Sequence, residues 1–443
     1  MKPDIFIISL GCPRNLVDCE VLVGKLKKHK HRVSYKIKDG CIGIVNTCGF
    51  TLDAKNESID VILELAGLKR EGRIKKIIVT GCLSQRYSKK LMKEVKEIDA
   101  IFGSSTFTEI PEYVDRILRG EKIVLIEKMP LFLYDHDMPR STMTPKHTVY
   151  VKIQEGCMNF CSYCVIPRIR GPFRSRSIES VLEEITRLKA SGAKEINLVG
   201  QDTTLFGMDT HKKYMLHELL MKASKIMKDG WVRLLYTHPA HYSQALIDTI
   251  KTVPEICKYV DLPIQHISDK ILKKMARATT KKSIMALIKK LKSNIPDLAI
   301  RTSVIVGFPG ETDKDFNELV NFIKEIEFDR LGAFVYSREE GTPAYDFKGQ
   351  IPEDIKRLRF GRIMEIQKDI SEKKNNLLLG KKLKILIDKK CVDKREYYVG
   401  RTQHDAPEVD GEVYIKTEKK LKAGAFLDAK IIGTMEYDLV GEI

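Results

Sequence analysis

The sequence predicts an α/β protein in three parts: an N-terminal domain on a parallel sheet, a partial barrel of six βα units, and a small antiparallel β-barrel. Two observations predict this. Short β-branched runs alternate with helical patterns along most of the chain, and after about residue 378 the pattern changes to short strands alone. The 443 residues are too many for one typical core, so several domains are expected.

The N-terminal domain is expected over residues 1–120. Three β-branched runs there precede helical patterns: "DIFIISL" (4–10), "IGIVNT" (42–47) and "KKIIVTG" (75–81). This alternation implies a parallel sheet with helices on both faces. Residues 121–142 contain prolines and no long periodic stretch, so a linker is expected there.

The partial barrel is expected over residues 143–373. Helical patterns separate six candidate strands, at 149–154, 195–199, 231–236, 258–263, 299–306 and 331–336, and one long basic helix is expected over 352–378. Six βα units suggest an incomplete relative of the eight-stranded barrel, with its site at the C-terminal ends of the strands. Such a barrel would leave one side open to a large substrate.

The last domain is expected over residues 376–443, where about five short strands suggest a barrel of the OB type, a common nucleic-acid binder. It is nearly neutral, with 13 Lys+Arg against 12 Asp+Glu, and "DAPEVDGE" (405–412) holds four acids. A surface that follows phosphates should be basic, so this barrel is better suited to docking a basic protein. The alternative is a solvated turn at 405–412 on a barrel that still touches RNA.

Composition narrows the class of protein. The net charge of +17 favours a polyanionic partner such as RNA or the ribosome, although solvated lysine-rich helix faces are an equal alternative. No apolar run approaches a membrane span, and "IFIISLG" lacks a basic leader, so it reads as a strand. Ten cysteines without a secretion signal indicate a reducing compartment, and a cytoplasmic location is expected.

The first site candidate is the motif Cys157-x3-Cys161-x2-Cys164, which starts where the first barrel strand ends. Three thiolates can hold three irons of a [4Fe–4S] cube and leave one iron without a protein ligand. An open coordination position is typical of a catalytic metal site. Zinc is the alternative, but it would need a fourth ligand, and no histidine lies close by in the sequence.

A second triplet consists of Cys12, Cys48 and Cys82, each directly after a predicted strand. Parallel strands end at the same edge of a sheet, so the three thiols could converge there. The repeated pattern favours a second metal site over three buried thiols acting as small hydrophobes. The remaining cysteines show no such pattern and are expected to be free thiols: Cys19, Cys41, Cys257 and Cys391.

CxxxCxxC after the first strand of a partial barrel resembles the radical S-adenosylmethionine superfamily. The resemblance implies that S-adenosylmethionine chelates the open iron and is split to a 5′-deoxyadenosyl radical, which can attack a C–H bond that no base can open. It also implies a set of cofactor contacts, Tyr163, Gly200, Gln201, Asp202, Gly307 and Gly310, although turns and core packing explain them as well. Nearby arginines could meet a carboxylate or cap helices: Arg170, Arg174 and Arg176.

The whole chain resembles the MiaB/RimO methylthiotransferase family, whose last piece is called a TRAM domain. The implied reaction abstracts hydrogen, inserts sulfur and transfers a methyl group. The resemblance assigns the radical to the barrel cluster and the sulfur to an auxiliary N-terminal cluster. A second S-adenosylmethionine would give the methyl group, and a donor such as flavodoxin or ferredoxin would supply electrons.

Three stretches favour one branch of that family: "SLGCPRNLVDCE" (9–20), "VNTCGF" (45–50) and "GRTQHDAPEVDGEVYI" (400–415). That branch converts an aspartate of the decoding-centre ribosomal protein uS12 to 3-methylthioaspartate. Cys19 departs from it, because serine is usual there. The alternatives are a tRNA adenosine methylthiotransferase and a non-enzymatic RNA-binding protein with zinc clusters. An ordinary methyltransferase is disfavoured because no Rossmann-type glycine fingerprint follows a predicted strand.

Overall fold

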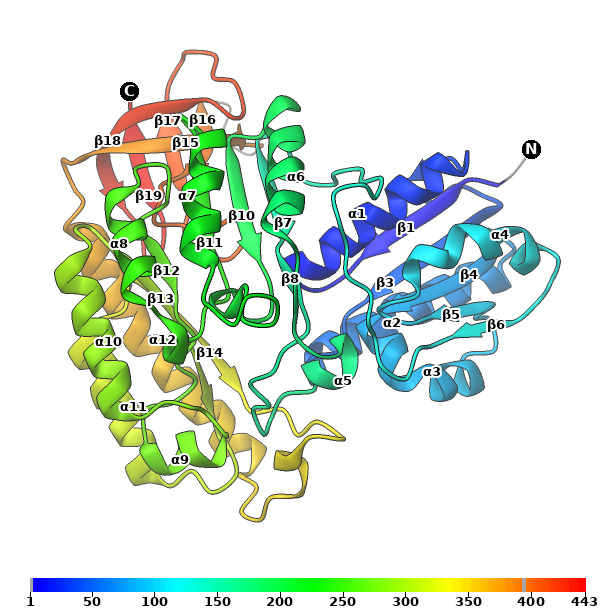
Figure 1. Cartoon of the computed structure of the whole chain (residues 1–443), viewed down its shortest axis with the longest axis horizontal. Helices are drawn as coiled ribbons and strands as arrows, with labels where there is room; N and C mark the ends of the chain where they lie inside the picture. Colours follow the sequence, from blue (N-terminus) through cyan, green and yellow to red (C-terminus); the bar gives the residue numbers. More distant parts are fainter. Residues whose placement is uncertain (1–2, 393–395) are drawn as a thin grey trace.

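The computed structural model describes residues 3–392 and 396–443. It confirms the predicted fold class: an N-terminal parallel sheet, a partial barrel and a closed five-stranded barrel follow one another along the chain (Figure 1). Among the described residues, no helix has both the length and the apolar content needed to cross a membrane.

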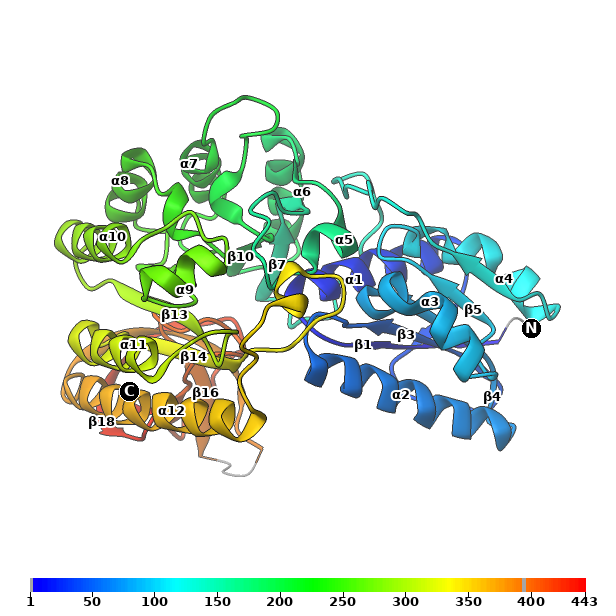
Figure 2. The same ribbon diagram turned by 90° about the horizontal axis from the view of Figure 1, so that it is seen from below.

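The N-terminal domain is one parallel sheet of six strands in the order β2-β1-β3-β4-β5-β6. Helices α2 and α3 pack on one face of the sheet, with α2 beside the sheet in Figure 2, and α1 and α4 pack on the other. Because the central strand β3 is buried along its whole length, its sequence is an apolar run rather than an alternating one. The elements are β1 (Ile5–Ser9), α1 (Pro13–Lys28), β2 (Val33–Ser34), β3 (Cys41–Thr47), α2 (Leu52–Arg70), β4 (Ile74–Gly81), α3 (Cys82–Glu94), β5 (Ala100–Phe102), α4 (Ile110–Leu118) and β6 (Ile123–Leu125).

Strand β6 lies inside the stretch 121–142 that was expected to be a linker. It pairs in parallel with β5 and forms the edge of the N-terminal sheet. The extended connection to the barrel therefore starts only after Leu125. A strand of three residues is too short to show a period, so the sequence pattern could not reveal it.

The middle of the chain forms a barrel that is open along one side. Two parallel sheets, β7-β10-β11 and β12-β13-β14, are not joined by a regular strand ladder among the described residues; an isolated bridge between Val232 and Ile256 and the hydrogen bond from the Thr237 N–H to the Asp261 carbonyl link them. All six expected strands are present: β7 (Thr148–Lys152), β10 (Glu195–Val199), β11 (Trp231–Leu234), β12 (Tyr259–Asp261), β13 (Ala299–Val306) and β14 (Arg330–Val335). The layer of helices around them consists of α6 (Ile178–Ala190), α7 (Leu216–Ile226), α8 (Gln244–Thr252), α9 (Asp269–Lys274), α10 (Lys281–Asn294), α11 (Asp313–Ile326) and the expected long helix α12 (Glu353–Asn376).

The C-terminal residues form a closed barrel in the order β15-β16-β17-β19-β18. It sits at the N-terminal ends of the barrel strands. Arg401 pairs with Glu195, the first residue of β10, at 2.8 Å, and Arg330 at the start of β14 pairs with Asp405 at 2.5 Å. The small barrel therefore closes the end of the partial barrel opposite to the predicted site. Its strands are β15 (Lys382–Lys390), β16 (Tyr397–Arg401), β17 (Val413–Lys416), β18 (Phe426–Thr434) and β19 (Leu439–Glu442).

The interpretation of 405–412 as an acidic docking loop is wrong for two of its four acids. Asp405 is 2% exposed and bound to Arg330. Asp410 accepts hydrogen bonds from the Tyr259 hydroxyl at 2.6 Å and from Arg301 at 3.2 Å. These carboxylates neutralise arginines at the bottom of the partial barrel, because buried charges need partners. They are not available to a basic protein.

Candidate functional site

The N-terminal cysteine triplet gathers at one edge of the sheet. Cys12 is the N-cap of α1, Cys48 follows β3, and Cys82 is the first residue of α3. Gly11 shows how tight the packing is: its φ is +88°, and a Cβ there would lie 2.9 Å from the sulfur of Cys48. The backbone before Cys12 thus requires glycine, both for its conformation and for the approach of the second cysteine.

The barrel triplet lies on the loop between β8 (Gln154–Glu155) and α5 (Ile166–Arg170). Burial raises the pKa of Cys157 to about 11 and that of Cys164 to about 12. Cys161 accepts a hydrogen bond from Arg277 at 3.8 Å. Buried thiols of this kind stay protonated until a cation takes the place of the proton, which is what metal binding does.

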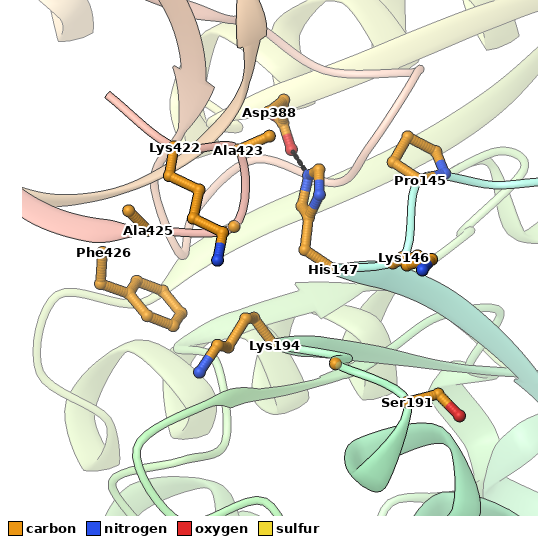
Figure 3. Close-up of a pocket in the computed structure, with 12 residues that line it drawn as sticks. Pro145, Lys146, His147, Ser191, Lys194, Asp388, Lys422, Ala423, Ala425 and Phe426 are labelled. Atoms are coloured by element: carbon orange, nitrogen blue, oxygen red, sulfur yellow. Dashed lines mark hydrogen bonds and ion pairs between the residues drawn. The ribbon is translucent and has the colours of Figure 1, made fainter. Parts of the chain in front are cut away.

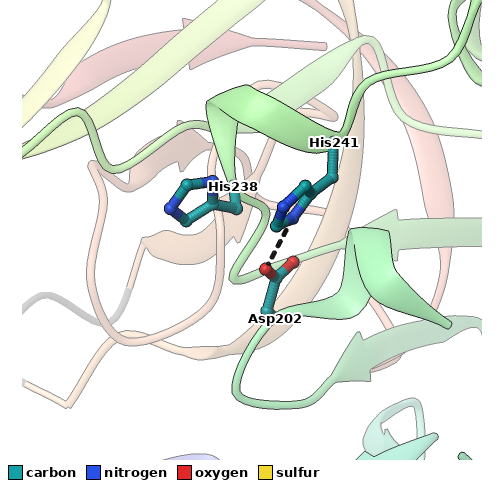
Figure 4. Close-up of side chains that lie close together, drawn as sticks. All are labelled: Asp202, His238 and His241. Carbon is teal, nitrogen blue, oxygen red and sulfur yellow. Dashed lines mark hydrogen bonds and ion pairs between the residues drawn. The ribbon is translucent and has the colours of Figure 1, made fainter. Parts of the chain in front are cut away.

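One compact set of metal-binding side chains lies beside the barrel triplet. Among the described residues, only Asp202, His238 and His241 form a set of three such side chains whose ligand atoms all lie within 4.8 Å of one another (Figure 4). Thiolates on one zinc ion at about 2.3 Å would be separated by about 3.8 Å. Neither cysteine triplet meets the 4.8 Å distance criterion among the described residues.

The two triplets face each other across the domain interface. Arg170, the last residue of α5, donates hydrogen bonds to the sulfur of Cys82 at 3.3 Å and to Asn15 at 3.1 Å, and it forms an ion pair with Asp18. In Figure 2, α5 lies between the barrel and helices α1 and α3. The loop that carries the barrel triplet is thus bound directly to the N-terminal domain.

A buried network of charges continues this interface. Lys152 forms ion pairs with Asp18 and, at 2.6 Å, with Glu155. Burial alone would raise the pKa of Glu155, but the charges of Lys152 and Arg170 outweigh it and lower the pKa to about 2. Gln201 donates to the same carboxylate at 2.6 Å. The network fixes the orientation of the two domains, since Asp18 of the N-terminal domain depends on Lys152 and Arg170 of the barrel as its partners.

Arg14 lies between the triplets. Its Nε donates to the sulfur of Cys12 at 3.4 Å, its Nη1 donates to the carbonyl of Gly200 at 3.1 Å, and its guanidinium lies 4.5 Å from the ring centroid of Tyr236. Burial would raise the pKa of Cys12, but the charge and hydrogen bond of Arg14, the backbone N–H of Asn15 and the charge of Arg170 together outweigh it, and the pKa lies below its usual value. The same charge also acts to lower the pKa of Cys164, a member of the other triplet.

The end of β10 offers an open hydrogen-bonding position. Gln154 is fully buried, and neither atom of its side-chain amide has a partner among the described residues. A Cβ on Gly200 would lie 2.4 Å from that amide. Buried polar atoms are normally paired, so this pair of atoms is suited to a polar ligand at the strand ends.

Asp202 lies beside the loop of the barrel triplet. Its Oδ2 accepts a hydrogen bond from Asn159 at 2.7 Å and lies 2.9 Å from Nδ1 of His241 (Figure 4). Burial lowers the pKa of His238 to about 2, so this neighbouring ring is neutral. The carboxylate therefore offers a negative charge next to Cys157, where the amino group of a cofactor could bind.

The structure accounts for Gly307 and Gly310 without a ligand. Their φ angles are +73° and +81°, and a Cβ on each would meet a lysine side chain at 2.3 Å, from Lys356 and Lys274 respectively. The ring of Tyr163 packs edge-on against Phe308, with centroids 6.5 Å apart. These positions fit the alternative interpretation of turns and core packing.

The other candidates are placed as follows. Arg176 pairs with Glu184 of α6 at 2.5 Å. Within the described ranges, Arg174 donates to backbone carbonyls alone, of Phe132, Arg170 and Pro172. Four cysteines stand apart from the triplets, with three buried and one partly exposed: Cys19, Cys41, Cys257 and Cys391.

Sequence reasoning missed the roles of Arg14 and Arg277. Arg14 could have been singled out from the sequence, because it lies two residues after Cys12. Arg277 could not, because it lies in an ordinary basic stretch far from the cysteines along the chain.

A second feature is a cavity of about 890 Å³ between the partial barrel and the C-terminal domain (Figure 3). Its lining includes Lys146, Lys194 and Lys422, and His147, which lies 3.0 Å from a carboxylate oxygen of Asp388. It is at the N-terminal end of the barrel strands, away from both triplets. The cavity is therefore a basic surface feature and not the site of the chemistry.

Comparison with known proteins agrees with this geometry. Residues 151–323 match the Radical SAM superfamily, 4–103 the uncharacterized protein family UPF0004, and 379–443 the TRAM domain. The ribosomal protein uS12 methylthiotransferase RimO of Desulforamulus reducens is 45% identical over 442 residues, covering 100% of this chain and 99% of the relative. That of Pelotomaculum thermopropionicum is 46% identical over 438 residues, covering 99% and 98%.

The likeness of this chain to a solved structure concerns the fold alone. The radical S-adenosylmethionine methyltransferase TsrM from Kitasatospora setae, determined with cobalamin and a [4Fe–4S] cluster bound, superposes with a TM-score of 0.58 at 13% identity. The match covers 78% of this chain and 77% of TsrM.

Proposed function

This chain belongs to the RimO family of ribosomal protein uS12 methylthiotransferases, and we propose that it converts an aspartate of uS12 to 3-methylthioaspartate. The observation that carries the proposal is the meeting of two cysteine triplets across one interface, with Arg14 and Arg170 between them. A reaction that removes a hydrogen at one centre and takes sulfur from another needs both centres to reach the same carbon atom.

We assign a [4Fe–4S] cluster to each triplet: Cys157, Cys161 and Cys164 in the barrel, and Cys12, Cys48 and Cys82 in the N-terminal domain. When bound, these clusters and S-adenosylmethionine supply the radical, the sulfur atom and the methyl group. The protein's part is to hold them in a fixed relation, through Arg170 and the buried pairs around Asp18.

S-adenosylmethionine is assigned to the strand ends beside the barrel triplet. The unpartnered amide of Gln154 and the carboxylate of Asp202 support this place. Gly200 and Gln201 belong to the same strand end. Tyr163, Gly307 and Gly310 lie on the neighbouring loops, where the two glycines permit the left-handed turns and the ring of Tyr163 packs against Phe308.

The positive charge of the chain is suited to two kinds of acidic partner, an electron carrier and ribosomal RNA. The net charge of +17 suits an acidic electron carrier such as flavodoxin or ferredoxin. The lysines around the cavity in Figure 3 are suited to ribosomal RNA next to the substrate protein. A cytoplasmic location is consistent with two sites that need reduced thiols.

The test is deletion of the gene, followed by mass spectrometry of intact small-subunit ribosomal proteins and of digested tRNA nucleosides. We expect uS12 to lose its methylthio mass while tRNA is unchanged. Loss of a methylthioadenosine from tRNA, with uS12 unchanged, would mean that the family's tRNA reaction is the correct one. If neither pool changes, the proposed substrate is wrong.

A further inference from the structure

The target aspartate must lie between the two triplets, and the side chain that stands there is Arg14. It contacts Cys12 on one side and the carbonyl of Gly200, at the end of barrel strand β10, on the other. A substrate carbon within reach of both cysteine triplets is therefore close to this guanidinium.

The guanidinium is held in place before any substrate arrives. Tyr236 lies under it, 4.5 Å from ring centroid to guanidinium carbon. Tyr236 has a left-handed φ of +58°, and its backbone N–H donates to Asp261 at 2.8 Å. A tyrosine adopts this backbone conformation only where the surrounding structure imposes it, and such residues concentrate at functional sites.

Part of the guanidinium remains free. Nε and Nη1 of Arg14 donate hydrogen bonds, but Nη2 makes no hydrogen bond with any residue that the structure describes, and the residue keeps a minor part of its surface exposed. A planar guanidinium with an open edge is the group that proteins use to bind carboxylates.

Two neighbouring arginines are less suited to this role. Arg170 is 3% exposed and already bound to Asp18 and Cys82. Arg277 donates from Nη2 to the carbonyl of Pro263 at 2.7 Å and from Nη1 to Cys161 on the barrel side. Arg14, in contrast, lies between the two triplets, and the Nη2 edge of its guanidinium is open.

We propose that Arg14 binds the side-chain carboxylate of the target aspartate and so selects aspartate as the residue that is modified. This inference rests on the proposed function. It makes Arg14 a specificity-determining residue, whose charge is matched to the substrate.

The experiment compares two synthetic peptides from the aspartate-bearing loop of uS12, one with the target aspartate and one with asparagine in its place. Reconstituted wild-type enzyme, Arg14→Gln, Arg14→Lys and the control Arg174→Gln are assayed for methylthio product and, separately, for peptide affinity by fluorescence anisotropy. The control removes a nearby arginine that binds only backbone carbonyls.

We expect the wild type to prefer the aspartate peptide by about 100-fold in both kcat/KM and Kd, as for a close charge pair. Arg14→Gln should lose this preference, because only the binding and turnover of the aspartate peptide should weaken. Arg14→Lys should keep part of the preference, and Arg174→Gln should keep it all. An unchanged preference in Arg14→Gln, with both peptides weakened equally, would overturn the inference. A wild type that makes no product from either peptide would instead contradict the proposed function.

Discussion

Arg170 donates a hydrogen bond to the sulfur of Cys82 over 3.3 Å, although one residue belongs to the barrel and the other to the N-terminal domain. The same guanidinium pairs with Asp18, and Cys82 packs against Val165 and Ile169 of the barrel loop. The two cysteine triplets are therefore parts of one site, and the domain interface is what brings them together.

Replacing Arg170 by methionine should destabilise the interface strongly. Asp18 and Glu155 would keep only Lys152 as a charged partner, and removing one member of a buried ion network costs about 3–5 kcal/mol. Urea unfolding of the metal-free chain measures the loss. The control is Arg187→Met, which removes an exposed pair with Glu183 and should cost about 0.5 kcal/mol. Equal losses would show that the network does not hold the domains.

The two triplets should differ in what they support. Cys157→Ala should abolish cleavage of S-adenosylmethionine, measured as 5′-deoxyadenosine, whereas Cys12→Ala should retain cleavage and block formation of the methylthio product. Each variant should also contain about half of the wild-type iron, because each triplet is assigned one cluster. Methylthio product from Cys12→Ala would contradict this division, and zinc in place of iron would contradict both assignments.

Glu155 should make the stability of the chain depend on acid pH. Its pKa is lowered to about 2 in the fold from a usual 4.5, so its contribution is present above pH 4.5 and is lost as pH falls towards 2. The size is about 3 kcal/mol. The difference in unfolding free energy between wild type and Glu155→Gln, measured in urea on metal-free protein, should therefore shrink between pH 6 and pH 3. A constant difference over that range would mean that protonation of Glu155 is not coupled to the free energy of unfolding.

Glu195 should hold the C-terminal barrel in place. It is fully buried and paired with Arg233 at 2.9 Å and Arg401 at 2.8 Å. Glu195→Gln removes the carboxylate that pairs with Arg233 and leaves Arg401 with Asp388, so a loss of about 3 kcal/mol and faster proteolytic release of residues 376–443 are expected. Asp428→Asn, which removes an exposed pair with Lys382 at 3.7 Å, is the matched control and should change neither measurement.

The sequence by itself determined the elements and the places of the thiols. Each barrel strand showed its own apolar run, because strand burial is a local property of a few residues. The convergence of Cys12, Cys48 and Cys82 followed from one rule, that parallel strands end at the same edge. Strand β6 was missed because three residues carry no period.

Only the tertiary structure decided how the site is completed. Arg14 meets Gly200, Arg170 meets Cys82 and Asp410 meets Arg301, and each pair joins segments more than 80 residues apart. No spacing rule links such segments, since their contact depends on how domains pack and on which buried charges need a partner. For this reason the sequence located the six thiols, and the fold showed which charges surround them.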